Sequence, residues 1–347
     1  MYIKKILWAI VLIGLAAAAY FAYYIYGAML APNTDFNNEE AYIYVKTTDG
    51  YHEVREQLKP LLEDIDKFDV LAKQKEYVNN VKSGKFVIEK GMSNNDIINS
   101  IRIKKVPVKV TFNNQGSLEK LAGRIAPQIE ADSVSLVKAM YDTSFLTENN
   151  FKKETALGMY IPNTYEFQWD TTAEGFRKKM RDEFNRFWND SRIAKAHALG
   201  LTPHQVIALA SIVYEESKQP SEQPRIAGVY LNRLRIGMPL QADPTLKFAA
   251  YQLPKYKNTV IKRVLNVHKD IESPYNTYKN RGLPPGLIAM PNISAIDAVL
   301  NYEKHKYLYF AADAKRPGYH KFAKTLAQHN VNAREYHQYL SSQGINK

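Results

Sequence analysis

Cysteine is absent from the 347 residues of this chain. A chain without cysteine has no disulfides, no thiolate nucleophile and no cysteine-based zinc site, although this absence does not identify the compartment. Internal repeats and low-complexity tracts are lacking too. A hydrophobic content of 45% and an aromatic content of 12% are enough for a real core, so global disorder is not expected. At this length, one large or two moderate domains are expected.

Charge is missing from a long stretch near the N-terminus. After Lys4 and Lys5, the uncharged run Ile6–Leu30 is longer than the roughly 20 residues that a helix needs to cross a membrane. Aromatic residues gather at its far end, as in an interfacial belt. Because lysines flanking a membrane helix stay in the cytoplasm, residues 31–347 are expected outside the cytoplasmic membrane. The alternative is a signal peptide cleaved near Ala16–Ala19, but the apolar run continues far beyond those alanines.

Acidic residues are too few to balance the basic ones, which leaves a net charge of +12. Such an excess favours nucleic acid or another acidic partner. A domain outside the cell rarely meets nucleic acid, so no nucleic-acid partner is predicted. Anionic lipid headgroups and an anionic cell-wall polymer remain as partners, and a merely basic, solvated surface is an equal alternative.

The order of expected elements predicts an α+β protein with three parts. These are a cytosolic tip and transmembrane helix over 1–30, a linker followed by a small α/β subdomain over 31–105, and a larger mixed domain over 106–347. Within the subdomain, the patterns predict a linker at 31–41, strands at 43–48 and 84–89, helices near 51–65 and 68–80, and a short helix capped by Ser93.

The larger domain opens with a strand at 106–112 and is mainly helical as far as residue 200. Thr202 as N-cap and Pro203 in the first turn predict a helix over 202–218, and another helix is expected over 223–236. A long irregular stretch follows at 237–292. The C-terminal part is expected to contain a hairpin with strands at 307–313 and 319–324, and then a helix.

The helix over 202–218 carries an acid at its apolar end. Leu209, Ile212, Val213 and Glu216 fall on one helical face, so Glu216 continues the stripe that should face the core. Burial and the carbonyl-rich end of the helix both disfavour its charged form, which raises the pKa as a general acid requires. Glu215 points to another side. A helix-terminal Glu is usually structural, so this pattern only nominates Glu216.

Two loops add groups that could bind sugars. "NRLRIGMPLQADPT" (232–245) is dense in amide, carboxylate and hydroxyl groups, and "PYNTYKNRGLPPGLIAMP" (274–291) is stiffened by four prolines and supplies Tyr275, Asn276 and Tyr278. Rigid aromatic faces and hydrogen-bonding groups are suited to sugar rings. A simple stiff connector is the alternative for the second loop.

Five segments resemble one family. "ASIVYEES", "LNRLRIGMPLQADPT", "YNTYKNRGLPPGLIAMP", "YLYFAAD" and "HKFAKTLAQHN", in this order and spacing, are similar to the YceG-like endolytic murein transglycosylases. The resemblance is close over 205–332 and looser over 106–204. Over 40–105 only the size and the order of elements are similar to the LysM-like subdomain of that family. In the family the first segment usually reads Glu-x-Glu-Thr/Ser with the second Glu catalytic, which corresponds to Glu216, whereas Tyr214 replaces the first Glu.

The resemblance implies a membrane-anchored lytic transglycosylase that needs no cofactor or metal. It would cleave the β-1,4 bond between N-acetylmuramic acid and N-acetylglucosamine, leave 1,6-anhydro-muramyl ends and terminate nascent glycan strands beside the peptidoglycan synthases. Glu216 would act first as acid and then as base. The residues expected to contact substrate are Ser217, Gln241, Asp243, Tyr275, Asn276, Tyr278 and His320. Asp243 could instead orient a neighbour or cap the turn before Pro244.

Two other functions remain open at the level of sequence. A glycoside hydrolase would use Glu216 as acid with Asp243 or Glu215 as second carboxylate, although Glu215 is a poor partner because it is adjacent on the helix. A non-catalytic wall-binding protein would use the 40–105 unit and the aromatic loops. His320, His329 and Asp313 lie near one another in sequence, but they lack a metal-binding spacing such as HExxH.

Overall fold

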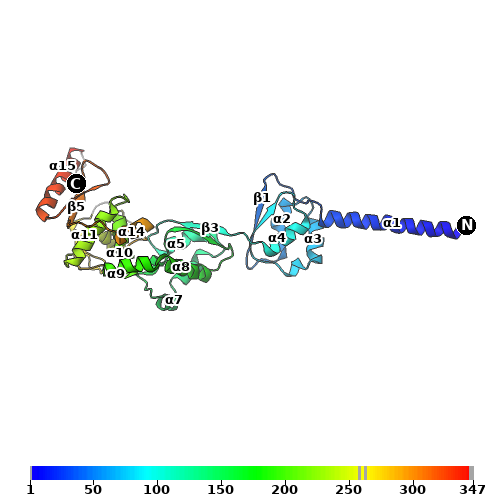
Figure 1. Ribbon diagram of the computed structural model, residues 1–347, viewed down its shortest axis with the longest axis horizontal. Helices are drawn as coiled ribbons and strands as arrows, with labels where there is room; N and C mark the ends of the chain where they lie inside the picture. The colour runs from blue at the N-terminus through cyan, green and yellow to red at the C-terminus, as the bar shows by residue number, and fades with distance from the viewer. Residues whose placement is uncertain (1, 257–258, 262–263, 344–347) are drawn as a thin grey trace. The chain divides into compact units, whose positions relative to one another are not determined.

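The chain divides into two compact units. The computed structural model describes residues 2–256, 259–261 and 264–343, which form a mixed α+β structure dominated by helices (Figure 1). The α+β class is confirmed. The first unit contains the chain up to residue 110 together with 126–132 and 165–172, and the second contains 111–125, 133–164 and the chain from 173 onwards. A single boundary near residue 105 therefore does not describe the division, because two later segments pack with the first unit.

The first unit is built on an antiparallel pair of strands covered by short helices. Its elements are α1 (Tyr2–Met29), β1 (Glu40–Val45), α2 (Tyr51–Leu58), η1 (Lys59–Leu61), α3 (Ile65–Gln74), η2 (Tyr77–Asn79), β2 (Gly84–Glu89), α4 (Asn94–Ile103) and η3 (Ala126–Gln128). Strand β1 pairs with β2 from Glu40 opposite Glu89 to Val45 opposite Gly84. Side chains alternate along the strands, so that Ile43, Phe86 and their neighbours two residues away enter the core.

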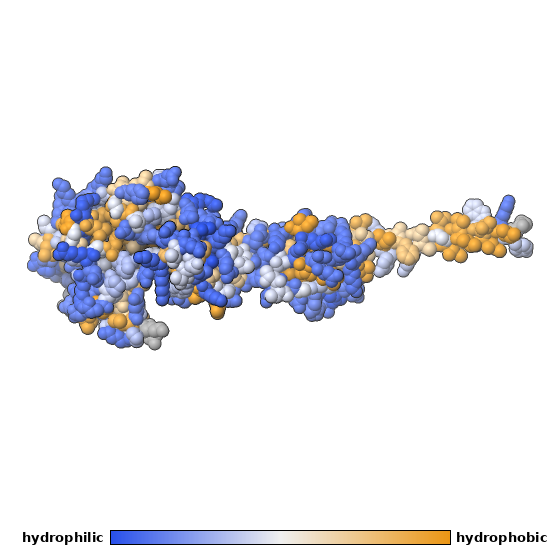
Figure 2. All heavy atoms as spheres, turned by 90° about the horizontal axis from the view of Figure 1, so that it is seen from below, coloured by the Kyte–Doolittle hydropathy of each residue, from blue (hydrophilic) through white to orange (hydrophobic). Residues whose placement is uncertain are grey.

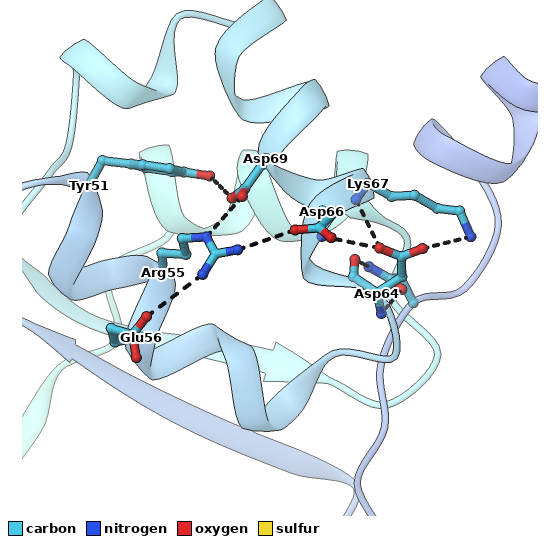
Figure 3. Close-up of polar contacts among 8 residues, drawn as sticks. Tyr51, Arg55, Glu56, Asp64, Asp66, Lys67 and Asp69 are labelled. Atoms are coloured by element: carbon cyan, nitrogen blue, oxygen red, sulfur yellow. Dashed lines mark hydrogen bonds and ion pairs between the residues drawn. The ribbon is translucent and has the colours of Figure 1, made fainter.

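A polar network joins α2 to α3 (Figure 3). Arg55 Nε donates to Asp69 Oδ2 at 2.8 Å, and Tyr51 Oη donates to the other oxygen of the same carboxylate at 2.6 Å. A further contact at 3.3 Å joins Arg55 Nη2 to Asp66. Asp64 caps α3 by accepting from the backbone N–H of Asp66 and Lys67. The network fixes the two helices beside each other over the apolar core.

Helix α1 is the one helix of the described residues that is long and apolar enough to cross a membrane. Apolar residues cover it (Figure 2), and its last turn enters the first unit. There Asn94 Nδ2 donates to the carbonyl oxygen of Ala28 at 2.9 Å, and Asn33 Nδ2 donates to Asn94 Oδ1 at 2.7 Å. Asn33 also bonds the backbone of Asp64 in both directions. The first residues of the predicted 31–41 linker are therefore part of the packed unit.

The second unit carries most of the helices. Its elements are α5 (Leu118–Ile125), α6 (Ser133–Met140), α7 (Thr143–Glu148), η4 (Ala156–Met159), α8 (Ala173–Phe187), α9 (Asp190–Ala198), α10 (Pro203–Glu216), α11 (Gln223–Arg235), α12 (Asp243–Tyr251), η5 (Pro254–Tyr256), α13 (Asn266–Lys269), α14 (Ile293–Leu300), β5 (Tyr309–Ala312), β6 (His320–Ala323) and α15 (Leu326–Ser342). Strands β3 (Val108–Phe112) and β4 (Asn163–Phe167) form a separate pair. Helix α10 is central, packing against α11, α12 and α14.

The predicted irregular stretch 237–292 is partly helical. It contains α12, η5 and α13, whereas its residues 257–258 and 262–263 lie outside the described part of the chain. Helix α12 begins with Asp243 and Pro244, both of which are common in a first turn. The sequence predicts a loop there because the polar start of this short helix merges with the loop before it.

Candidate active site

Helix α10 begins and ends where its sequence favours it. Thr202 Oγ1 accepts from the backbone N–H of Gln205, and the Gln205 side chain accepts from the Thr202 N–H, which makes a capping box with Pro203 next in the chain. The helix ends at Glu216 because Ser217 is extended. Leu209, Ile212 and Val213 are buried as the apolar stripe predicted.

Glu216 lies partly buried where this stripe reaches a pocket. Its Oε1 accepts a hydrogen bond of 2.7 Å from the hydroxyl of Tyr230, which comes from α11 and is only 1% exposed. Burial raises the pKa of Glu216 to about 7, helped by the charge of Asp243, while the Tyr230 bond, His320 and Arg233 act in the opposite direction. A carboxylic acid with this pKa is about half protonated at neutral pH and can act as acid and as base.

The two neighbours of Glu216 on α10 point elsewhere. Glu215 is exposed and pairs with Lys218 Nζ at 2.9 Å. Tyr214 donates to Asn114 Oδ1 at 3.1 Å, and the ammonium of Lys218 lies 3.5 Å from its ring centre. Neither residue lines the pocket. A carboxylate at position 214 would therefore not lie beside Glu216 in the pocket.

The pocket has a volume of about 320 Å³ and is assembled from three parts of the second unit. The first part is helices α10 and α11, the second is the loop before α12 with the start of α12 and the loop after α13, and the third is the hairpin with α15. Its lining residues are Glu216, Tyr230, Arg233, Leu240, Gln241, Asp243, Tyr278, Tyr309, Phe310, Leu326 and His329.

Hydrogen bonds join the two loops that carry Gln241, Asp243 and Tyr278. The backbone N–H of Gln241 donates to the carbonyl of Thr277, and that of Ala242 donates to Thr277 Oγ1, both at 3.0 Å. Tyr278 Oη donates to Asp243 Oδ1 at 2.6 Å. Gln241 has a φ of 49°, a left-handed backbone that is uncommon for a residue other than glycine and is frequent at functional sites.

Four of the predicted substrate residues lie outside the pocket lining. Asn276 is fully buried, and its amide donates to the carbonyls of Lys269 and Ile271 and accepts from the Tyr278 N–H, so it holds the loop in shape. Tyr275 lines another cavity, where it packs on Phe248 with ring centres 4.6 Å apart.

Ser217 and His320 meet at a second buried carboxylate beside the pocket. Glu222, 5% exposed, accepts from the His320 backbone at 2.7 Å and lies 2.8 Å from its Nδ1. Burial acts to raise the pKa of Glu222, but the hydrogen bonds from His320 and Ser217 together outweigh it and keep the pKa low. These hydrogen bonds thus link the end of α10 to β6 through Glu222. Sequence reasoning missed Glu222, because nothing local distinguishes it from other Glu residues at a helix start.

Tyr230 and Arg233 were also missed as site residues. They stand three residues apart on α11 and therefore share a face, which was the signal available in the sequence. The sequence does not show that the end of α10 faces Tyr230 and Arg233, so their shared helix face alone could not assign them to the site. As for metals, no three His, Cys, Asp or Glu side chains within the described ranges are grouped to hold an ion.

Known proteins share this sequence and fold. The YceG-like family model matches residues 43–335. An endolytic murein transglycosylase from Bacillus subtilis strain 168 is 30% identical over 297 residues, covering 78% of this chain and 80% of the relative. One from Streptococcus pneumoniae serotype 2 is 26% identical, and the match covers 53% of its length. A crystal structure of a yceG-like protein from Listeria monocytogenes matches 85% of this chain and 99% of that chain, with a TM-score of 0.55 and 26% identity. The chain described here belongs to the YceG-like family.

Proposed function

We propose that this protein is an endolytic lytic transglycosylase of peptidoglycan, with Glu216 as its acid and base. The observation that carries the proposal is the carboxyl of Glu216, which lines a polar, aromatic pocket and whose pKa is raised to about 7. The names of the curated relatives supply the substrate, murein, and the type of reaction.

In the first step, Glu216 donates its proton to the glycosidic oxygen between a muramyl and a glucosaminyl residue, and the bond from this oxygen to the muramyl C1 breaks. Tyr230 occupies Oε1, so the proton is delivered from Oε2. The Tyr230 hydroxyl stays a donor throughout, because burial raises its pKa well above the usual value.

In the second step, the muramyl 6-hydroxyl attacks C1 and closes a 1,6-anhydro ring. Oε2 of the ionised Glu216 takes the hydroxyl proton, which restores the acid for the next cycle. The nucleophile lies within the substrate, so one carboxyl serves both steps, whereas most glycosidases need two. Gln241 and Tyr278 line the same pocket and are proposed to hold the sugars or their acetamido groups, with Asp243 orienting Tyr278.

One observation favours a second candidate, a glycoside hydrolase. Asp243 lines the same pocket as Glu216, and its charge contributes to the raised pKa of Glu216. Such a carboxylate could activate a water molecule, which would then attack the muramyl C1 in place of the 6-hydroxyl. Glu215 is not suited to this task, since it is exposed and paired with Lys218.

Product analysis in water labelled with heavy oxygen separates the two reactions. Full-length protein in detergent is incubated with uncrosslinked glycan strands, and the fragments are analysed by mass spectrometry. The proposal predicts muramyl ends that lack one water and carry no label. Labelled reducing ends would show hydrolysis instead, and uncut strands would contradict both candidates.

We also propose the setting of the reaction. Helix α1 would anchor the chain in the cytoplasmic membrane with Lys4 and Lys5 inside and the two units on the outer face, where nascent strands are made. The first unit, expected from the sequence to be LysM-like, would help to hold polymeric glycan. Peptidoglycan synthases at the membrane would be the protein partners, because they produce the strands that this enzyme ends.

A further inference from the structure

Arg233 brings a buried positive charge to the wall of the pocket. Its side chain is only 7% exposed overall. Nε donates to the carbonyl of Leu308 at 2.6 Å, and Nη1 donates to that of Leu240 at 2.6 Å. The guanidinium carbon lies 5.3 Å from the ring centre of Tyr309. All these contacts fix the guanidinium plane at the junction of α11, the loop before α12 and β5.

This charge has no carboxylate partner among the described residues. Arg233 belongs to no ion pair, and a buried charge without one is costly unless it is compensated. Carbonyl oxygens and an aromatic face compensate it in part. Burial lowers the pKa of Arg233, but an arginine remains charged in a protein.

The two carboxyl groups of the pocket are engaged with other residues. Glu216 accepts from Tyr230, and Asp243 accepts from Tyr278. Neither forms an ion pair with Arg233, whose Nε and Nη1 donate to backbone carbonyls instead. Nη2 of Arg233 donates to no protein atom in the part of the chain that is described, and it is not sealed from the pocket. Nη2 therefore offers the pocket a fixed, charged donor for which the described residues supply no acceptor.

We propose that Nη2 of Arg233 binds the lactyl carbonyl oxygen of the muramyl residue whose bond is cleaved. The inference rests on the proposed function. Within a murein strand, this oxygen is an acceptor that muramyl residues carry and glucosaminyl residues lack. It is an amide oxygen where a stem peptide is attached and a carboxylate oxygen where the peptide has been removed. Arg233 thus selects which sugar of the alternating strand enters the site beside Glu216.

Binding to the wild-type protein provides a test that does not depend on a variant. The probes are a glucosaminyl-muramyl disaccharide with a free lactyl carboxylate, the same disaccharide with a lactyl amide, and a disaccharide with a 3-O-ethyl ether that has no carbonyl. A hydrogen bond to a charged group predicts that loss of the carbonyl weakens binding about tenfold or more. The carboxylate and amide arms distinguish stripped from peptide-bearing strands. Equal affinity for all three ligands would overturn the proposal.

Variants of Arg233 then assign the effect to this residue. Arg233→Gln should bind the ether as wild type does and lose the preference for the carbonyl ligands, and Arg233→Lys should keep a part of it. Thermal unfolding shows whether each variant is folded, and if neither is, the wild-type series decides alone. A folded Arg233→Gln protein that keeps the full preference would contradict the assignment. Wild-type protein that leaves glycan strands uncut would instead contradict the proposed function.

Discussion

Glu216 has its unusual acidity because two sets of neighbours oppose each other. Burial and the charge of Asp243 disfavour the carboxylate, whereas the Tyr230 hydroxyl, His320 and Arg233 favour it, and the resulting pKa is about 7. The same balance has a cost in stability. An unfolded glutamate ionises near pH 4.5, so the folded state binds one proton more than the unfolded state between about pH 4.5 and 7. Stability is consequently lost as the pH rises through that window.

Replacement of Glu216 by Gln should therefore stabilise the protein in neutral and alkaline solution. The amide has no charge to bury and still accepts from Tyr230. We expect Glu216→Gln to gain about 3 kcal/mol over wild type at pH 8, and the difference to disappear below about pH 4.5. Thermal unfolding of both proteins from pH 4 to pH 8 measures it. A gain that is the same at both ends of this range would contradict the raised pKa.

Removal of one hydroxyl tests how Tyr230 acts on Glu216. Tyr230→Phe keeps the buried ring against Phe310 but deletes the hydrogen bond that lowers the pKa of Glu216. The pKa should then rise above 7, which moves the alkaline limb of the kcat/KM profile to higher pH. The rate should fall about tenfold, because the acid is no longer held in one orientation. Tyr302→Phe, outside the pocket lining, is the control. An unshifted profile for Tyr230→Phe would contradict the role.

The acid could be nominated from the sequence, but most of its partners could not. A helical period of 3.6 residues is enough to place Glu216 on the apolar face of its helix and Glu215 off it. Tyr230 and Glu222 act through contacts between elements, and no local sequence pattern predicts which helix faces pack against each other. Asn276 and Tyr275 have the chemistry of sugar-binding residues, but Asn276 is buried within its own loop and Tyr275 packs on Phe248 of α12.

At the scale of elements, prediction succeeded where start and stop signals were strong. The Thr202–Pro203 start, the Gly84–Glu89 strand and the Ser93 cap are confirmed by the structure. The region from 51 to 80 is more broken than expected, because Pro60 ends α2 in a 3-10 turn. Helix α12 was missed because it is short, and contacts from distant segments hold it: it packs against α10, and its start is hydrogen-bonded to Thr277.

The loop before Tyr278 should depend on Asn276 for stability. Asn276→Asp places a carboxylate against the carbonyls of Lys269 and Ile271, to which the amide now donates. We expect a loss on the order of 3 kcal/mol in the free energy of unfolding, measured by denaturant titration. Asn280 also donates to two carbonyls of this loop, those of Ser273 and Asn276, but it is exposed. Water can solvate the new carboxylate there, so Asn280→Asp should cost less, about 1 kcal/mol. Unchanged stability of Asn276→Asp with a raised KM would point to a substrate contact instead.

At the scale of the whole molecule, the apolar helix α1, the proposed membrane anchor, continues into folded structure without a flexible tether. Ala28 and Asn33 are buried in the first unit, and Phe36 packs against its core. A chain lacking residues 1–26 should leave the membrane and keep this unit intact. A chain lacking 1–36 should lose about 2 kcal/mol or more from it, because the bonds made by Asn33 are gone. Hydrogen exchange of α4 in both truncated chains measures the difference, and equal protection would show that 31–36 is a passive linker.

Cleavage of glycan strands by two matched variants tests the central claim most directly. Full-length wild type, Glu216→Gln and Glu215→Gln are compared on the same uncrosslinked strands, with released fragments quantified by mass spectrometry. Glu216→Gln cannot deliver a proton, so turnover should fall roughly a hundred- to ten-thousand-fold, toward the upper end because one carboxyl serves both steps. Glu215→Gln should stay close to wild type, since its side chain is exposed and pairs with Lys218. Near-normal turnover by Glu216→Gln, or an inactive Glu215→Gln, would contradict the assignment of Glu216 as the catalytic acid.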